Sequence, residues 1–514
     1  MMGRHGVAVV SMAISAVIAV WGVWRPEQMT GSALALTTFS LQKLDWLFMG
    51  ACTLFLALSL FLAVGPYGKI KLGADDEEPE FDTVSWLCMM FAGGMGAGLL
   101  FWGVAEPIYH FDQPPGEVGR TAEAARTAFV ITNFHWGLHA WAIYGVCSLV
   151  IAYFTFRRGA PAMVSAPIEY SLRPVLGPRL TPILSKTADV VGVLAVVFGI
   201  AGSLAMGTLM TRTGMSEVFG TPADNMMSFY ILVAMTVMFL ISACTGVDKG
   251  IKFLSNFNMA IAGVIMLFVL FAGPTTFIFD VFVTSIGDYL SSILELSFRI
   301  FAYDETLRKW THSWTLTYLI WWIAWGPFVG IFIARISRGR TIREFCVGVI
   351  LVPTLFSMLW FAIFGGAALY IEMFGGGGLT EFVMEDVTSA LFSFFGYLPG
   401  TTALNVFGIL LIYIFLVTGA DSGTYVISMM ATNGNLNPSN VTRIVWGLIM
   451  AAITMAVLLS GSTEVAKAMA ITGAIPYTFI VLLQVVGFMR ALREERLPAA
   501  GGRLATAPAS AAAE

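Results

Sequence analysis

Large aromatic side chains recur at helical spacing in two apolar stretches of the 514-residue chain. In the first stretch, Trp136, Trp141 and Tyr144 stand at i, i+5 and i+8, which predicts one face of a helix. In the second, a stripe is formed by Trp314, Tyr318, Trp321 and Trp325, with Trp322 beside it. Aromatic faces attract cations without needing a hydrogen bond, and quaternary ammonium groups are commonly recognised in this way. Lipid-facing aromatics are the alternative interpretation of each stripe taken alone.

Titratable residues do not form a pattern that predicts catalysis. The candidates Glu106, Asp189 and Asp421 are far apart in the sequence, and no set of nucleophile, base and orienting group accompanies them. His135 and His139 have the i, i+4 spacing of a metal pair but lack an evident third ligand, so structural hydrogen bonding is favoured. A channel would need a ring of carbonyls or charges, and four filter loops are absent from the sequence.

The composition indicates an integral membrane protein. Hydrophobic residues make up 57% of the chain and charged residues 12%, whereas soluble domains carry about 25% charged residues. A net charge of −4 gives no reason to expect nucleic acid as a partner. Twelve apolar runs are long enough to span a bilayer, which predicts an all-α integral membrane fold. These runs are 7–24, 43–64, 82–104, 127–153, 187–210, 226–245, 255–283, 310–336, 345–371, 401–430, 440–462 and 465–489.

Basic residues predict the orientation of these spans. Most of the 28 Lys and Arg residues fall on one side when twelve spans are counted, which places both termini in the cytoplasm. The first run follows Arg4 and resembles a signal peptide, but it has no small-residue cleavage site, so we interpret it as a membrane helix. We therefore expect a multi-pass protein of the inner, or plasma, membrane.

Two of the predicted spans carry helix-breaking sequences. The third contains the run Gly93-Gly94-Met95-Gly96-Ala97-Gly98, which favours local unwinding over close packing through small residues. The eighth contains Trp325-Gly326-Pro327, where proline removes a backbone donor. Paired interruptions five spans apart predict two inverted five-helix repeats, helices 3–7 and 8–12, with a binding site near the membrane midplane.

An amphipathic segment separates the two predicted repeats. Apolar residues recur at i, i+3, i+4 and i+7 between Ile286 and Phe301, which predicts a helix at the membrane surface. The predicted organisation is therefore two N-terminal membrane helices (1–72), a first repeat (73–285), the surface helix (286–309), a second repeat (310–492) and a short disordered tail (493–514).

At these residues the chain resembles the betaine/choline/carnitine transporter family. The resemblance covers nearly the whole membrane portion and is strongest in Gly94 to Pro107, in the run from His135 to Tyr144, and in Trp314 to Arg340. A weaker similarity lies in Thr418-Gly419-Ala420-Asp421-Ser422. The resemblance implies a homotrimeric carrier with a leucine-transporter-like fold.

The resemblance also implies roles for the aromatic residues. Trp136, Trp141, Tyr144 and Trp322 match the central aromatic box of the family, which holds a trimethylammonium or similar head group. Trp321 and Trp325 match aromatics along the same path. The chain departs from the betaine carriers at Thr317, where they place another aromatic residue.

Sodium is the coupling ion that the resemblance implies, and no other cofactor is expected. Ala92, Met95 and Thr418 match one sodium site, whose second hydroxyl position is here Gly419. Phe328 and Ser203 match a second sodium site. Gly98 is a glycine where an acidic residue is associated with choline and proton coupling. Sodium symport is therefore expected, with sodium-independent exchange of carnitine- or choline-type compounds as the alternative.

The rest of the substrate is less constrained than its cationic head. Backbone N–H groups freed around Gly94, Gly96 and Gly98 would favour a carboxylate, because unsatisfied amides at the start of a half-helix attract anions. That chemistry favours a betaine over choline. The sequence thus predicts secondary active uptake of a small onium compound resembling glycine betaine.

Overall fold

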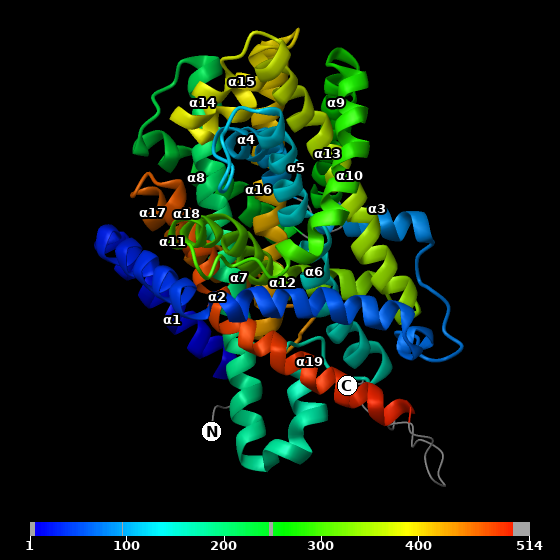
Figure 1. Ribbon diagram of the computed structural model, residues 1–514. Coiled ribbons are helices and arrows are strands. Elements are labelled where there is room, and N and C mark those ends of the chain that lie inside the picture. Colours follow the sequence, from blue (N-terminus) through cyan, green and yellow to red (C-terminus); the bar gives the residue numbers. More distant parts are fainter. Residues whose placement is uncertain (1–5, 95, 246–249, 497–514) are drawn as a thin grey trace.

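The computed structural model describes residues 6–94, 96–245 and 250–496, and the secondary structure of this part is helical (Figure 1). One isolated antiparallel bridge, between Lys71 and Thr341, is the exception in the described ranges. The first half of the chain forms α1 (Gly6–Trp24), α2 (Pro26–Val64), α3 (Thr83–Gly94), α4 (Ala97–Asp112), α5 (Ala122–Trp136), α6 (Leu138–Ala152), α7 (Arg173–Phe219), α8 (Asn225–Thr245), α9 (Gly250–Ala272) and α10 (Thr275–Leu296). The second half forms α11 (Glu305–Thr311), α12 (Thr317–Ile336), α13 (Ile342–Phe374), α14 (Leu379–Glu385), α15 (Ala390–Gly396), α16 (Thr401–Ala431), α17 (Asn440–Leu458), α18 (Thr463–Thr472) and α19 (Ala474–Arg496).

Twelve helical stretches of the described chain are long and apolar enough to cross a membrane, which confirms the predicted all-α class and the number of spans. The twelve spans predicted from the sequence and the twelve helical stretches of the structure differ in one member. The predicted span 82–104 is split into the short helices α3 and α4, and α10 is the additional long apolar helix. The glycine run therefore interrupts its helix, as the sequence predicted.

The helices between residues 255 and 311 have other bounds than those expected. The predicted span 255–283 ends at Ala272, because Gly273 and Pro274 stop α9 and Pro274 precedes the first turn of α10. The helix expected at 286–309 is instead α10, which ends at Leu296, followed by a separate helix, α11. Asp304 starts α11 by accepting a hydrogen bond from the Leu307 N–H at 3.0 Å.

Helices α6 and α12 cross closely in the buried part of the bundle. An added Cβ at Gly326 would lie 2.9 Å from the Cys147 sulfur, and one at Gly330 would lie 3.2 Å from the Cys147 Cβ. Small residues on α12 thus let the two backbones approach each other. This contact places the aromatic residues of α6 beside those of α12.

The interruption predicted at Pro327 is wrong. Helix α12 continues through Gly326 and Pro327 from Thr317 to Ile336. A proline is tolerated inside a membrane helix when neighbouring helices surround it, and Pro327 and Gly326 are both buried. The irregular part of this span lies nearer its start, where residues His312–Leu316 form a π-helical turn.

A break that the sequence did not predict separates α5 from α6 at Gly137. A Cβ at this position would lie 2.3 Å from the Asn133 carbonyl oxygen, so the close approach requires glycine. Trp136 is therefore the last residue of α5, whereas Trp141 and Tyr144 belong to α6. The single aromatic face predicted for this stretch is accordingly divided between two helices.

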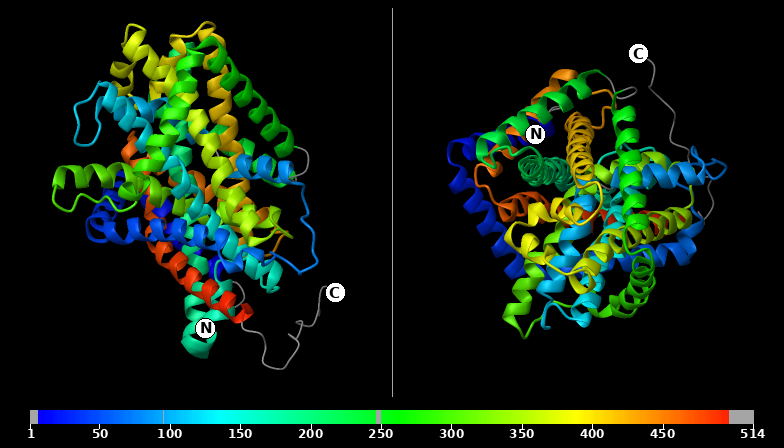
Figure 2. Two further views of the ribbon diagram at one scale, coloured as in Figure 1. Left: turned by 45° about the vertical axis from the view of Figure 1, so that its right-hand side comes forward. Right: turned by 90° about the horizontal axis from the view of Figure 1, so that it is seen from above.

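Helices α1 and α2 lie along the outside of the bundle (Figures 1 and 2). One polar contact fixes α2 to the start of the eighth predicted span. The buried Asp45 carboxylate accepts a hydrogen bond from Arg308 at 2.7 Å, and its Oδ2 lies 3.0 Å from His312 Nε2. The helices that carry the aromatic residues are thus held from the outside as well as by each other.

Candidate functional site

A cavity of about 1480 Å³ lies between the central helices and brings together most of the residues selected from the sequence. Its lining includes Trp136, Tyr144, Trp321, Trp322, Trp325, Gly96, Gly98, Ser203, Phe328 and Thr418. Of the remaining candidates, Trp141 does not line the cavity and Met95 lies outside the described residues. Ala92 and Gly94 are described only as residues of α3.

Three cavity-lining rings from three helices pack against one another, and we call them the aromatic cage (Trp136, Tyr144 and Trp322). The Trp322 ring lies edge-on to both others, with centroid distances of 5.1 Å to Trp136 and 5.3 Å to Tyr144. The interplanar angles are 85° and 86°. Trp322 is thus nearly perpendicular to both neighbours, and all three residues line the cavity, so their π-systems border a space in which a compact cation could be attracted.

Further aromatic residues that the sequence did not assign to the box support the cage from behind. Tyr318 lies 5.6 Å from Trp136 and 5.7 Å from Trp102, and both Tyr318 and Trp102 also line the cavity. Phe361 on α13 packs 5.3 Å from Trp136. Tyr318 belonged to the aromatic stripe and Trp102 to the motif of the third span, so both positions carried a sequence signal.

Hydrogen bonds fix the orientation of two cage tryptophans. The Trp322 indole N–H donates to the backbone carbonyl of His135 at 2.9 Å. The Trp136 indole N–H donates to Glu106 Oε2 at 2.7 Å. Because both donors are buried and satisfied, each ring is held in one orientation instead of turning to find a partner.

Trp141 has a different position from that expected of a cage residue. It is completely buried, its indole nitrogen has no hydrogen-bond partner among the described residues, and its ring packs edge-on against Tyr144 at 5.8 Å. The turn at Gly137 changes the relation between α5 and α6, so spacing along one ideal helix does not describe the three aromatics. Trp141 therefore supports Tyr144 from outside the cavity.

The interrupted third span supplies backbone groups to the same cavity. Gly96 precedes α4 in an extended conformation, and residues 96–99 all line the cavity. The first N–H groups of a helix have no partner within the helix and carry its positive dipole end. A Cβ on Gly98 would lie 3.4 Å from the Trp136 ring, so this helix start is adjacent to the cage.

Hydroxyl groups of two candidate sodium ligands also reach the cavity. Thr418 Oγ1 donates to the Ile414 carbonyl at 2.9 Å, and Ser203 Oγ donates to the Gly199 carbonyl at 2.9 Å. Both hydroxyl oxygens therefore keep lone pairs that can accept or coordinate. Gly419 adds no side-chain oxygen beside Thr418, and a Cβ there would meet nothing within 4 Å.

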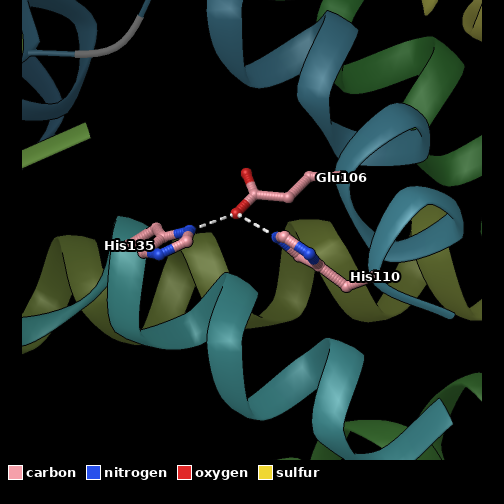
Figure 3. Close-up of side chains that lie close together, drawn as sticks. All are labelled: Glu106, His110 and His135. Carbon is pink, nitrogen blue, oxygen red and sulfur yellow. Dashed lines mark hydrogen bonds and ion pairs between the residues drawn. The ribbon is translucent and has the colours of Figure 1, made fainter. Parts of the chain in front are cut away.

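A buried polar cluster lies directly behind the cage, formed by Glu106, His110 and His135 (Figure 3). Glu106 Oε1 lies 2.5 Å from His135 Nδ1 and 3.5 Å from His110 Nε2. The sequence signal for this cluster was the i, i+4 spacing of Glu106 and His110, which was not used. His135 and His139 do not form a pair, because His139 Nε2 lies 3.1 Å from the Ser297 hydroxyl.

Comparison with known proteins shows the family of the chain. Residues 6–497 match the family model described as BCCT, betaine/carnitine/choline family transporter. A glycine betaine transporter of Bacillus subtilis (strain 168) is 41% identical over 487 residues, which is 94% of both chains. A probable glycine betaine transporter of Desulfitobacterium hafniense (strain Y51) is 38% identical over 496 residues, covering 96% of this chain and 98% of the relative.

A third relative is named for other solutes. It is an ectoine/hydroxyectoine transporter of Virgibacillus pantothenticus, 39% identical over 485 residues, with 94% of this chain and 95% of the relative covered. These matches span the aromatic cage, the interrupted third span and all twelve apolar helices. The chain is a multi-pass membrane protein that belongs to the betaine/carnitine/choline transporter family, as its sequence motifs predicted.

Proposed function

We propose that this protein takes up a small quaternary ammonium or related onium compound resembling glycine betaine, by secondary active transport with alternating access. The observation that carries the proposal is the aromatic cage of Trp136, Tyr144 and Trp322 next to the start of α4. Relatives named as glycine betaine transporters support the same substrate class.

The two ends of a betaine have different chemistry, and the cavity offers a partner to each. The cage attracts the methylated cationic head through its ring faces. The N–H groups at the start of α4 would receive the carboxylate, because a helix N-terminus stabilises an anion. Choline has a hydroxyl in place of the carboxylate, so it would lose the second interaction.

Sodium symport is part of the proposal. Thr418 on α16 and Ser203 on α7 present hydroxyl oxygens at the cavity, and hard cations prefer oxygen ligands. Phe328, matched by resemblance to the second sodium site, lines the cavity beside Trp325 at a ring distance of 5.5 Å. We propose uptake across the plasma membrane by a homotrimer with both termini in the cytoplasm.

Sodium-independent exchange is the second candidate, and one observation favours it. Gly419 provides no hydroxyl at the position where the sodium-driven members place the second one. One ligand fewer weakens a sodium site and would allow transport to be driven by exchange of one onium solute for another. The two candidates share the aromatic cage and differ only in what drives the cycle.

Uptake into proteoliposomes tests both parts of the proposal. Vesicles containing the purified protein are supplied with radiolabelled glycine betaine under an inward sodium gradient, an inward potassium gradient, or with unlabelled betaine inside. Symport predicts accumulation that depends on the sodium gradient, whereas exchange predicts uptake that depends on internal solute and is unchanged in potassium. No uptake of glycine betaine, choline, carnitine or ectoine under any condition would contradict the onium assignment.

A further inference from the structure

We propose that Glu106, His110 and His135 form a binding site for a divalent transition-metal ion of the zinc type, which we call the triad site. This site goes beyond the proposed transport function, because it lies behind the aromatic cage and its ligands do not line the cavity. One carboxylate and two imidazoles are the ligand types that zinc and its neighbours in the first transition row prefer.

The three ligand atoms converge. Glu106 Oε1, His110 Nε2 and His135 Nδ1 all lie within 4.8 Å of one another, and all three residues are fully buried (Figure 3). Bonds of about 2.0–2.2 Å to a tetrahedral zinc ion place neighbouring ligand atoms about 3.3–3.6 Å apart. The separation of 3.5 Å between Glu106 Oε1 and His110 Nε2 already fits. The pair at 2.5 Å would open by about 1 Å as the ion replaces the proton between them.

His110 supplies the second, independent observation. Both of its ring nitrogens are buried; Nδ1 has no hydrogen-bond partner among the described residues, and Nε2 has the Glu106 carboxylate at 3.5 Å as an ion-pair partner without a hydrogen bond. A buried polar atom without a partner costs free energy, and native structures rarely leave one unexplained. The Nε2 atom is on the side of the ring that faces Glu106. An ion bound between them would replace this long contact with a direct ligand bond to Nε2.

Neighbouring groups contact the triad residues through polar atoms, as the outer partners of a metal site commonly do. The second ring nitrogen of His135, Nε2, lies 2.9 Å from the Thr315 hydroxyl. The second oxygen of Glu106 accepts the hydrogen bond from the Trp136 indole at 2.7 Å. Such contacts hold a metal ligand in one orientation and fix which histidine nitrogen carries the proton.

Charge and access are compatible with an ion at this place. The Glu106 carboxylate supplies one negative charge, and Lys467, which lies over the Trp314 ring that packs against His110, is paired with Glu464 at 2.8 Å. Tyr318 stacks on His135 at 4.8 Å and also lines the cavity, so the Tyr318 ring covers the triad on the cavity side. An ion would reach the triad from the cavity when this ring turns aside.

Binding of purified protein to Zn²⁺ and Co²⁺ tests the triad site without any transport measurement. The chain has five histidines, so the protein is purified with a tag that contains none, treated with a chelator and reloaded. We expect one Zn²⁺ per chain with a Kd below about 10 μM, and a Co²⁺ absorption band of a tetrahedral site with nitrogen ligands.

Two matched variants decide whether the triad site is what binds Zn²⁺. His110→Gln should weaken Zn²⁺ binding at least tenfold, because it removes one ligand while leaving the hydrogen bonds of Glu106 to His135 and Trp136. His312→Gln, which changes another histidine with a carboxylate partner, should leave the affinity unchanged. If wild type binds no Zn²⁺, or if His110→Gln binds it as tightly as wild type, the triad site is refuted. Should His110→Gln fail to fold, Glu106→Gln gives the same test.

A second measurement connects the triad to the cage and rests on the proposed function. A divalent ion beside Glu106 adds positive charge behind Trp136, so it should weaken binding of a cationic head group. Zn²⁺ at saturation should raise the betaine concentration needed for half-maximal tryptophan quenching at least threefold, and betaine should weaken Zn²⁺ binding by the same factor. An unchanged betaine affinity would refute this coupling. A protein that binds Zn²⁺ but no onium compound would contradict the proposed function and leave the triad site intact.

Discussion

The Trp322 indole N–H donates a hydrogen bond to the His135 carbonyl, which joins α12 to the end of α5 across 187 residues of sequence. The same His135 contacts Glu106 through its ring, and Glu106 accepts from Trp136. Two of the three cage rings are therefore oriented through one polar network.

Replacement of Trp322 should weaken substrate binding in two separable steps. Trp322→Phe keeps an aromatic face but loses the bond to His135, whereas Trp322→Leu also loses the face. A cation–π contact contributes about 0.5–2 kcal/mol, so Trp322→Leu should raise KM for glycine betaine about two- to thirtyfold. The KM of Trp322→Phe for glycine betaine should lie between those of Trp322→Leu and wild type. Uptake kinetics and surface expression measure the effect, and a normal KM for Trp322→Leu would place the site elsewhere.

Trp136 and Trp141 should respond differently to the same substitution. Trp136→Phe replaces the cavity-lining indole with a smaller ring and removes the hydrogen bond to Glu106, so KM should rise. Trp141→Phe removes no hydrogen bond and acts only through Tyr144, so KM should change less than about threefold. Its main effect should be a lower melting temperature, because a fully buried ring becomes smaller. Equal KM values for the two variants would show that Trp141 also contacts the substrate.

A carboxylate at position 98 should reverse the preference between betaine and choline. Gly98→Asp places a negative charge at the start of α4, where the betaine carboxylate is proposed to bind, so KM for glycine betaine should rise about tenfold or more. KM for choline should fall. Gly98→Ala is the control for size, because its Cβ would lie at an ordinary contact distance of 3.4 Å from Trp136. A similar rise in KM for glycine betaine in Gly98→Asp and Gly98→Ala would show a steric cause.

A hydroxyl at position 419 should strengthen sodium dependence. Gly419→Ser adds an oxygen beside Thr418 in a place where a Cβ meets nothing within 4 Å. Under the symport proposal, the sodium concentration for half-maximal uptake should fall about tenfold or more, as expected for one additional polar contact to a charged group. Gly419→Ala tests whether the backbone change alone has an effect. If Ser and Ala behave alike, this position does not contribute to ion coupling.

An ion pair outside the membrane helices should make a small, pH-dependent contribution to stability. The Arg120 guanidinium donates to Glu381 at 2.7 Å and to Asp112 at 2.6 Å, and it holds the pKa of the Glu381 carboxyl below its usual range. A carboxyl with a lowered pKa stabilises the folded state at neutral pH, and this stabilisation is lost as the pH falls through the lowered pKa. Glu381→Gln should lower the melting temperature by about 2 °C or less at pH 7, because Glu381 is largely exposed. The difference from wild type should disappear in acid; a constant difference would point to packing instead.

The helical architecture could largely be predicted from the sequence, because span length and apolar composition are local properties. The glycine run around Gly96 was correctly recognised as an interruption, since several glycines in succession remove helix preference at one place. Pro327 was misjudged, because whether a proline interrupts a membrane helix depends on its neighbours. The break at Gly137 also depends on a neighbour, because the Tyr289 hydroxyl of α10 accepts a hydrogen bond from the Leu138 N–H at 3.1 Å.

The site was predicted in part. Helical spacing selects Trp136 and Tyr144, because aromatic residues at helical intervals are visible in any sequence, and the family resemblance adds Trp322, which stands beside the stripe of the eighth span. The polar network behind them was not predicted, because Glu106 and His135 are 29 residues apart, and His135 and Thr315 are 180 residues apart. Pairing over such distances follows from helix packing, which no local pattern specifies.

The break at Gly137 divides the aromatic cage between two helices, with Trp136 at the end of α5 and Tyr144 on α6. A ligand that fills the cage contacts both helices, whereas a smaller cation could contact one ring and leave the other helix without a contact to the ligand. Occupying the site and completing a transport cycle would then be separate requirements. Some compounds that bind well should therefore act as inhibitors, so that the range of solutes carried is narrower than the range recognised.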